Sequence, residues 1–405
     1  MTRRTFMRLS FAFITCVAVW ISAGSNTEWD YPIDAGPPID ALVHLRIHDF
    51  LAAHPVMGPL SLVFRAPFAA IGQVVGNGGP DHNYLDDYRY GTFACLVVAG
   101  SFGLALARFA ENRGRGPLVC AAAVVLSVLN PVSLRAVHFG HAEEVFGAAL
   151  LAGAMLAAVA RRPWLAAALV AMAVANKQWG LIGLPAVLVV LWASVGFQRL
   201  RVAALIPAGA FVLLAVPLLI VDAHGVVDLT RRMADIRGTY VWPASLWYGL
   251  APELPPAKAA ISVPGLHDMP DLLGLVARPL IILVGIAVPL LLARRVREDV
   301  LHRAFPLLAL VMLLRCALDP ADNGYYHVPF LIALIAADTI NGRFYATAVA
   351  CVVLQLPTTL HLRPETLSLF YACWAPAFVV YLAGRTYGLD WVAWIRSAPQ
   401  RSRPT

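Results

Sequence analysis

Charged residues are scarce in this chain. They make up only 14% of its 405 residues, whereas 60% of the residues are hydrophobic, and an ordinary soluble domain has about 25% charged residues. This composition excludes a soluble globular protein and indicates a membrane protein. Apolar runs recur along the chain, each close to the roughly 17–25 residues that a helix needs to cross a bilayer. Because a backbone in lipid must satisfy its own hydrogen bonds, we predict an all-α, polytopic transmembrane helical bundle.

Several binding patterns are also missing. The six cysteines lie in or beside apolar runs with no CxxC spacing, and no HExxH pattern occurs. A disulfide framework and a thiolate or zinc centre are therefore not supported. No metal ligands and no cofactor are predicted, although a divalent cation stays open. The net charge of +7 does not indicate nucleic acid, because the arginines gather in turns between apolar segments.

The N-terminus carries a basic head, TRRTFMR, before a short apolar run. It resembles a twin-arginine export signal, and a cleaved signal peptide is an alternative. Since the rest of the chain is itself rich in apolar segments, we expect this segment to remain as the first membrane helix.

Arginine clusters set the expected orientation, because positively charged turns stay in the cytoplasm. An even number of crossings must separate consecutive clusters, which predicts twelve spans. These are 6–23, 90–109, 117–135, 144–160, 164–176, 178–196, 202–221, 272–293, 304–318, 328–341, 344–358 and 367–384. The prediction is a multi-pass protein of the plasma membrane with both termini in the cytoplasm and most histidines and acids outside.

The twelve spans form one domain, 1–405, with two long outer loops at 24–89 and 222–271 and a cytoplasmic tail at 386–405. Within the first loop, PIDALVHLRIHDFLAAHP has apolar residues at helical spacing, and Asp40, His44 and His48 follow one another at i, i+4 steps. This pattern predicts an amphipathic helix that lies in the membrane interface.

Asp30 and Asp34 are candidate catalytic residues in the same loop. A transferase that activates a hydroxyl needs a carboxylate base near the membrane surface. The alternative is that these acids keep the loop soluble or cap the helix that begins near Pro37.

A second polar group interrupts the apolar sequence at HFGHAEE. His138, His141 and Glu144 are three residues apart in turn, so one helix face could present all three, with Glu143 beside them. We predict a substrate-binding role, with a polar cap between two helices as the alternative and metal ligation as the least favoured interpretation.

Lys177 is one of only two lysines and lies in ANKQWG, at the expected outer turn between two short helices. A buried ammonium needs an anionic partner, which could be a lipid-linked phosphate or the nearby Glu143 or Glu144. Snorkelling of the lysine to the surface is the alternative.

A last outer segment, RCALDPADNGYYHVPF, mixes polar and aromatic residues in a way that suits a sugar ring, although an aromatic belt would look similar. Its candidate substrate-binding residues are Arg315, Asp322, Asn323, Tyr325, Tyr326 and His327. Arg135 is a further outer cation that could hold a phosphate.

This arrangement resembles the GT-C superfamily of integral-membrane glycosyltransferases. The strings GHAEEVFGAAL, ANKQWGLIGLPAVL and LDPADNGYYHVPFLIAL are similar to the actinobacterial polyprenol-phosphomannose-dependent mannosyltransferases. The resemblance implies an inverting transfer of a sugar, mannose or arabinose, from a polyprenyl-phosphate donor to an envelope glycan or glycolipid acceptor.

In such enzymes an aspartate of the first outer loop is the base. The matching position is Asp34 or Asp30, and Asp34 is slightly preferred because it directly precedes the amphipathic helix. The loop has no DxD pattern, which weakens a metal-dependent variant. A transporter or flippase for a lipid-linked sugar, or a non-catalytic scaffold of an envelope-assembly complex, remains an alternative. A transporter would place its polar groups at mid-membrane in repeated halves, and no internal repeat is seen.

Overall fold

The computed structural model describes residues 3–25, 30–53, 58–75, 84–259, 262 and 264–389. Its elements are almost all helical, as predicted. The α-helices are α1 Arg3–Ala23, α2 Tyr31–Asp34, α3 Gly36–Val43, α4 Ile47–Ala52, α5 Pro59–Val75, α6 Leu85–Glu111, α7 Pro117–Leu129, α8 Pro131–His138, α9 Ala142–Val159, α10 Pro163–Asn176, α11 Gly180–Val195, α12 Phe197–Ala203, α13 Leu205–Ala234, α14 Pro256–Ala259, α15 Asp271–Glu298, α16 Val300–Leu318, α17 Val328–Asn341, α18 Tyr345–Leu360 and α19 Pro364–Tyr387.

Short elements complete the fold. Two 3-10 helices, η1 Tyr248–Leu250 and η2 Gly324–His327, lie in loops. Strands β1 Tyr240–Val241 and β2 His267–Asp268 form an antiparallel pair in which Tyr240 faces Asp268 and Val241 faces His267.

Six helices among the described residues are long and apolar enough to cross a membrane, so the chain is a multi-pass membrane protein. They are α6, the α7–α8 pair, α9, α15, α16 and α19, and a pair bent by 42° within 197–234 would add a seventh. A helix lies at each of the twelve ranges expected from the sequence. Several of the other helices are shorter, such as α10 with 14 residues and α11 with 16.

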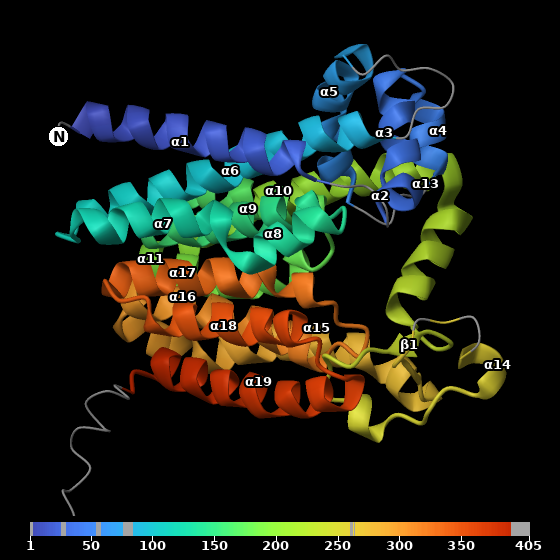
Figure 1. Ribbon diagram of the computed structural model, residues 1–405. Helices are drawn as coiled ribbons and strands as arrows, with labels where there is room; N and C mark the ends of the chain where they lie inside the picture. Colours follow the sequence, from blue (N-terminus) through green and yellow to red (C-terminus); the bar gives the residue numbers. More distant parts are fainter. Residues whose placement is uncertain are drawn as a thin grey trace, which may run out of the picture.

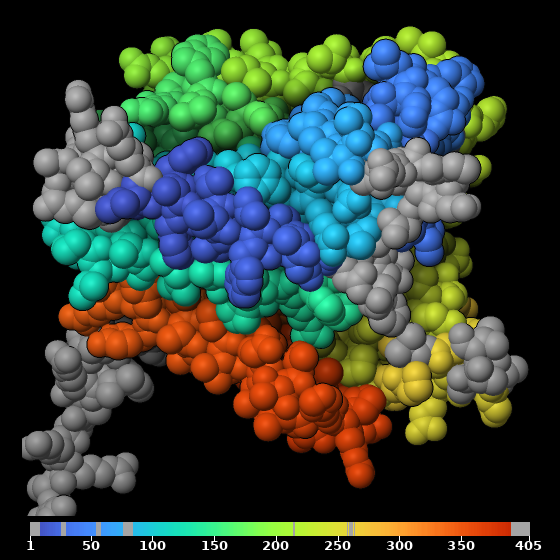
Figure 2. Space-filling view, turned by 45° about the horizontal axis from the view of Figure 1, so that its top comes forward, coloured from blue at the N-terminus to red at the C-terminus, as the bar shows by residue number. Residues whose placement is uncertain are grey.

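The long helices lie side by side, and the two ends of the bundle differ (Figure 1). The start of α1 and the end of α19 lie at one end. The helices α2 to α5 and the segment that carries β1 and α14 lie at the other, which we call the loop end. In the space-filling view, α1 runs over the outside of the bundle next to α5 (Figure 2).

The core is centred on α9, whose 18-residue apolar stretch is 94% buried inside the bundle. This helix packs against α6, α10, α11, α16 and α17. Close packing depends on small residues, since a Cβ at Gly147 would meet Asn176 and Trp179, and one at Gly183 would meet Leu151. Any charged residue at the start of α9 is therefore enclosed by other helices.

The first outer loop differs from the prediction. The single amphipathic helix expected there is wrong, because the chain breaks between α3 and α4, where Leu45 has a left-handed φ of 56°. The break lets the Arg46 side chain turn back onto Asp40. The loop also contains α5, a 17-residue apolar helix that the sequence analysis did not separate from the loop.

The other two boundaries also shift. The second loop was expected from 222, but α13 continues to Ala234 with a non-helical break at Asp222. The predicted tail was to begin at 386, but α19 continues to Tyr387. The rest of that tail, 390–405, lies outside the described residues.

Candidate functional site

The polar segment HFGHAEE forms a sharp turn between two helices. Helix α8 ends at His138, Gly140 takes a φ of 90°, and His141 is the N-cap of α9. The spacing predicted that the two histidines share one helix face, and this prediction is wrong. His138 is exposed, whereas His141 is only 4% exposed.

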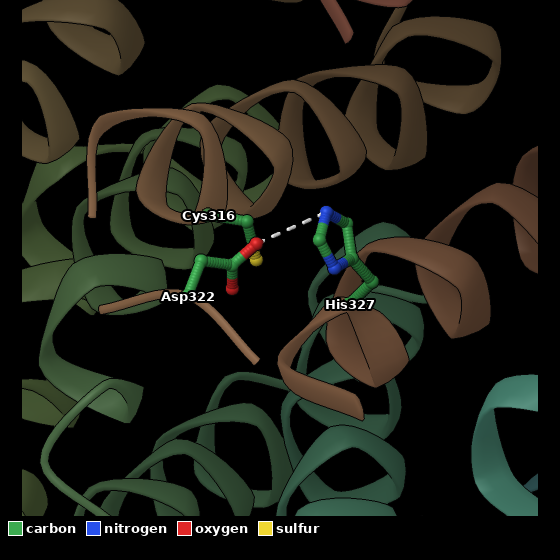
Figure 3. A group of neighbouring side chains, drawn as sticks. All are labelled: Cys316, Asp322 and His327. Atoms are coloured by element: carbon green, nitrogen blue, oxygen red, sulfur yellow. Dashed lines mark ion pairs between the residues drawn. The ribbon is translucent and has the colours of Figure 1, made fainter. Parts of the chain in front are cut away.

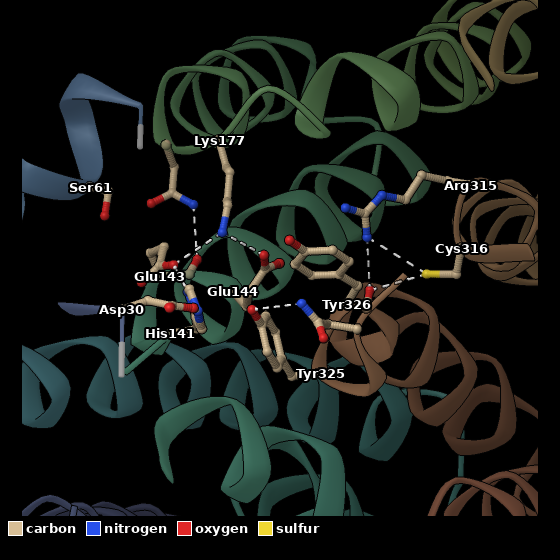
Figure 4. A network of polar contacts seen from close by, with 12 residues as sticks. Asp30, Ser61, His141, Glu143, Glu144, Lys177, Arg315, Cys316, Tyr325 and Tyr326 are labelled. Carbon is tan, nitrogen blue, oxygen red and sulfur yellow. Dashed lines mark hydrogen bonds and ion pairs between the residues drawn. The ribbon is translucent and has the colours of Figure 1, made fainter. Parts of the chain in front are cut away.

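His141 bridges two carboxylates at the loop end. Its Nε2 lies 2.8 Å from Asp30 Oδ2, and its Nδ1 lies 2.9 Å from Glu143 Oε1 (Figure 4). Burial opposes a charge on this ring, but Glu143 and the hydrogen bonds to Asp30 and Glu143 raise the pKa of His141 to about 9. His141 is therefore a cation at neutral pH, with both ring nitrogens donating.

Glu143 continues this network into the bundle. Lys177 Nζ lies 3.1 Å from Glu143 Oε1 and 2.7 Å from Glu144 Oε1, and both glutamates are fully buried. Arg65 lies on the other side, with Nη1 3.6 Å from Glu143 Oε2. Asn176 donates to the Glu143 carbonyl at 2.9 Å. We call Asp30, His141, Glu143, Glu144, Lys177 and Arg65 the charge network.

Lys177 occupies its place because α10 ends at Asn176. Residue 177 is extended (φ −159°, ψ 144°), and α11 begins at Gly180. The short helices thus end beside the start of α9. Since its ammonium is already shared by two buried carboxylates, Lys177 is committed to internal ion pairs rather than open to a ligand.

Asp30 is positioned by its neighbour Tyr31. The Tyr31 ring is fully buried, and its centroid lies 4.8 Å from that of the Tyr88 ring. The Arg65 guanidinium carbon lies 5.6 Å from the centroid of the Tyr31 ring. A Cβ at Gly140 would stand 3.3 Å from the Tyr31 backbone nitrogen. This packing seats α2 against the turn before α9 and brings Asp30 to His141.

The two candidate bases have different surroundings. The Asp30 side chain is 49% exposed, and its hydrogen bond with His141 lowers its pKa, so it is ionised at neutral pH. Burial and the nearby Asp30 charge raise the pKa of Asp34. Within the described part of the chain, no ion pair or side-chain hydrogen bond joins the Asp34 carboxylate.

Aromatic rings from η2 cover the network. The Tyr325 ring stacks on His141 with centroids 4.4 Å apart and planes 20° apart. Tyr326 lies between two cations, since Lys177 Nζ is 5.9 Å and Arg315 Cζ is 4.6 Å from its ring centroid. Arg315 also donates to the Tyr326 carbonyl at 3.1 Å. Asn323 donates to the Tyr325 hydroxyl at 3.3 Å.

Asp322 and His327 lie in a second buried group with Cys316 (Figure 3). One ligand atom from each lies within 4.8 Å of the others, a set that could hold a metal ion. However, Arg315 Nη1 is 3.7 Å from the Cys316 sulfur, and this fixed cation opposes a second one. The Tyr371 hydroxyl lies 3.3 Å from Asp322 Oδ2 and 3.1 Å from His327 Nε2, so the group is organised by hydrogen bonds.

Arg135 lies on α8, beside η2. It donates to the Thr358 hydroxyl at 2.8 Å, and its guanidinium is 5.7 Å from the Phe139 centroid. A Cβ at Gly324 would stand 3.0 Å from its Nη1. No carboxylate of the described residues forms an ion pair with it.

Sequence reasoning missed three residues that shape the site, namely Tyr31, Arg65 and Tyr371. Arg65 offered a signal, because it is a single cation inside the apolar segment that became α5. The two tyrosines offered none, since buried aromatics are common in membrane helices.

No protein-family model and no curated protein matches this chain. The chemistry of the site therefore has to be argued from its geometry. It offers a half-exposed carboxylate held by a buried imidazolium, at the end of a membrane bundle that carries the long loops. Such a group can accept a proton from a hydroxyl at the membrane surface.

Proposed function

We propose that the protein is a membrane glycosyltransferase that moves a sugar from a polyprenyl-phosphate donor to a glycan or glycolipid acceptor of the cell envelope, with inversion at the anomeric carbon. The observation that carries the proposal is the pairing of half-exposed Asp30 with buried, cationic His141 at the loop end. The similarity of three sequence strings to polyprenol-phosphomannose-dependent mannosyltransferases supports the same reaction class.

Asp30 is the proposed general base, in preference to Asp34. Its Oδ2 accepts a hydrogen bond from His141, which orients the carboxylate and keeps it ionised. The acceptor hydroxyl loses its proton to Asp30 while its oxygen bonds to the anomeric carbon. The bond from that carbon to the phosphate oxygen breaks, and the lipid phosphate leaves with the electron pair.

The leaving phosphate needs a cation, and Arg135 is the candidate that the geometry favours. Lys177, which the sequence suggested, is shared by Glu143 and Glu144. Arg135 has no carboxylate partner among the described residues and lies on the helix that leads into His138 and the Gly140 turn. A guanidinium suits a phosphate because it can donate two parallel hydrogen bonds.

The remaining parts of the proposal concern the membrane. The helices at the other expected ranges complete twelve spans in a GT-C-like bundle, with termini in the cytoplasm and the loop end outside the plasma membrane. Helices as short as α10 and α11 suit a thinned region beside the site.

The test is transfer of labelled sugar by the purified protein in lipid nanodiscs. Donors are polyprenyl-phosphate mannose and polyprenyl-phosphate arabinose, each labelled in the sugar, with an envelope extract as acceptor. We expect one donor to be consumed, with release of polyprenyl phosphate. Asp30→Asn should lower the rate by roughly 10²–10⁴-fold, the usual contribution of a general base.

Asp228→Asn is the matched control, because Asp228 is 66% exposed on α13 and far in sequence from the site. It should leave transfer unchanged. Asp34→Asn separates the two candidates, and a larger loss there than in Asp30→Asn would reverse their order. Movement of intact donor across a vesicle membrane, with no release of polyprenyl phosphate, would show a transporter instead.

A further inference from the structure

A cavity of about 840 Å³ opens at the end of the bundle opposite the charge network. It lies where three segments meet: the turn between α15 and α16, the turn between α17 and α18, and the end of α19. Its lining residues are Asp299, His302, Arg303, Asp338, Asn341, Arg343, Tyr345, Ala346, Val349, Ala377, Phe378, Tyr381, Arg385, Gly388 and Leu389. None of them takes part in the proposed reaction.

The acids of this cavity are already satisfied. Asp299 pairs with His302 at 2.9 Å and caps α16. Asp338 accepts from the Thr347 backbone nitrogen at 2.9 Å and from its hydroxyl at 3.0 Å. The Asp299 and Asp338 carboxylates are therefore held by hydrogen bonds to neighbouring residues.

Two of its arginines are not neutralised in this way. Arg303 pairs with Glu298 at 2.9 Å, but Arg343 and Arg385 form no ion pair with a carboxylate anywhere in the described ranges. Arg385 donates to the Tyr381 hydroxyl at 2.7 Å, and Arg343 is exposed. The cavity thus presents two guanidinium groups with no carboxylate of the described residues at ion-pair distance, and Asp338 acts on Arg385 only from further away.

Part of the cavity lining is apolar. Ala346, Val349 and Phe378 form this part, from α18 and α19, with Val349 52% exposed. Arginines are common in turns at the cytoplasmic side of a membrane, because positive charge there fixes the orientation of the helices. A cavity that joins two arginines without ion pairs to apolar side chains has the polarity that suits an amphiphile with an anionic head.

We propose that this cavity binds the phosphate headgroup of an anionic membrane lipid from the leaflet at this end of the bundle. Arg343 and Arg385 hold the phosphate, and the upper acyl chains lie against Val349 and Phe378. Basic pockets between membrane helices are suited to such headgroups. The inference is independent of the proposed sugar transfer, because the cavity and the charge network lie at opposite ends.

The experiment measures lipid retention by the full-length protein in nanodiscs that contain phosphatidylglycerol or phosphatidylcholine. Native mass spectrometry then counts lipids that remain bound after transfer to detergent. We expect phosphatidylglycerol to be retained selectively by the wild-type chain. Arg343→Gln with Arg385→Gln should weaken its binding on the order of tenfold to thirtyfold, since each surface arginine contributes about 1 kcal/mol.

The control pair is Arg113→Gln with Arg162→Gln, which removes the same charge from exposed turns outside the cavity. Its lipid retention should match the wild type. Val349→Trp fills the apolar side of the cavity without changing its charge, and it should also release the lipid. Because this variant keeps both arginines, its loss of lipid could not be explained by a folding defect that their removal causes.

Three results would overturn the proposal. Equal loss in the control pair would mean that only general charge matters. Unchanged retention in both the arginine variant and Val349→Trp would mean that the lipid binds elsewhere. Displacement of phosphatidylglycerol by millimolar glycerol phosphate, with no retention of diacyl lipid, would assign the cavity to a soluble phosphate.

Discussion

His141 and His327 are both buried, yet their surroundings differ in sign. His141 lies between Asp30 and Glu143, and these carboxylates outweigh burial and raise the pKa of His141 to about 9. At His327, burial and the Arg315 charge act together and lower the pKa to about 3. Burial alone therefore does not decide the charge of a histidine here. The carboxylates beside His141 reverse the effect of burial, whereas at His327 burial is the larger cause and Arg315 adds to it.

The largest effect should come from removing the cation that joins the two glutamates. Lys177→Met leaves Glu143 and Glu144 buried without their shared partner, and we expect a loss of about 3–5 kcal/mol in the free energy of unfolding. Lys258→Met is the matched control, because Lys258 is 44% exposed and its one ion pair among the described residues is with Asp268. Thermal unfolding in detergent should show a clear fall for the first and little change for the second. Equal shifts would mean that the network is not an ion-paired unit.

A smaller effect should come from the charge of His141, which makes the stability of the protein depend on pH. Because its pKa is raised from 6.5 to about 9, its contribution to stability is full below pH 6.5 and is lost as the pH rises through 9. The contribution is up to about 3 kcal/mol. His141→Gln should remove this dependence, so melting curves of wild type and variant should converge towards pH 10. Parallel curves from pH 6 to 10 would contradict a charged His141.

His327 should show the opposite dependence. Its pKa is lowered to about 3. Between pH 3 and 6.5 this histidine is protonated in the unfolded chain but neutral in the folded one, so the stability of the protein rises with pH over that range. At pH 5 the difference is about 2 kcal/mol. His327→Gln should be less sensitive to acid than the wild type, measured as the change in melting temperature between pH 7 and pH 5. An equal or greater acid sensitivity in the variant would show that His327 is not held neutral.

The smallest effect should be that of Tyr325→Phe. The ring that stacks on His141 stays, and only the hydroxyl that accepts from Asn323 at 3.3 Å is lost. We expect about 0.5–1.5 kcal/mol or less in stability and no change in the pH at which His141 titrates, followed by its ring proton resonances. A shift of that titration would mean that the hydroxyl, and not only the ring, sets the charge of His141.

The helices could be predicted well from the sequence because arginine clusters and apolar runs mark them independently. The split of 163–195 into α10 and α11 followed from its length and its flanking arginines. By contrast, α5 was hidden in a loop assignment, because in a chain that is 60% hydrophobic a 17-residue apolar run is not distinctive. The break at Leu45 has no sequence marker, since leucine rarely adopts a positive φ.

One partnership in the site was predicted correctly, because Glu143 or Glu144 was expected beside Lys177 and both lie there. His141, Glu143, Glu144 and Lys177 do lie together, whereas His138 and Arg135 lie outside the network and His327 belongs to another group. The Asp30–His141 contact joins residues 111 positions apart. Periodicity describes neighbours along a helix, so it holds no information about such a contact.

That separation also sets an order of events during synthesis. Asp30 leaves the ribosome before the residues that hold it, and 147 further residues must follow before Lys177 completes the network. At common elongation rates this takes roughly 7 to 30 seconds. Throughout that interval α1 and α2 have no finished bundle to pack on, because α9 and α10 have not yet been synthesised in full. The charge network is thus assembled from an early segment of the chain and from helices synthesised well after it.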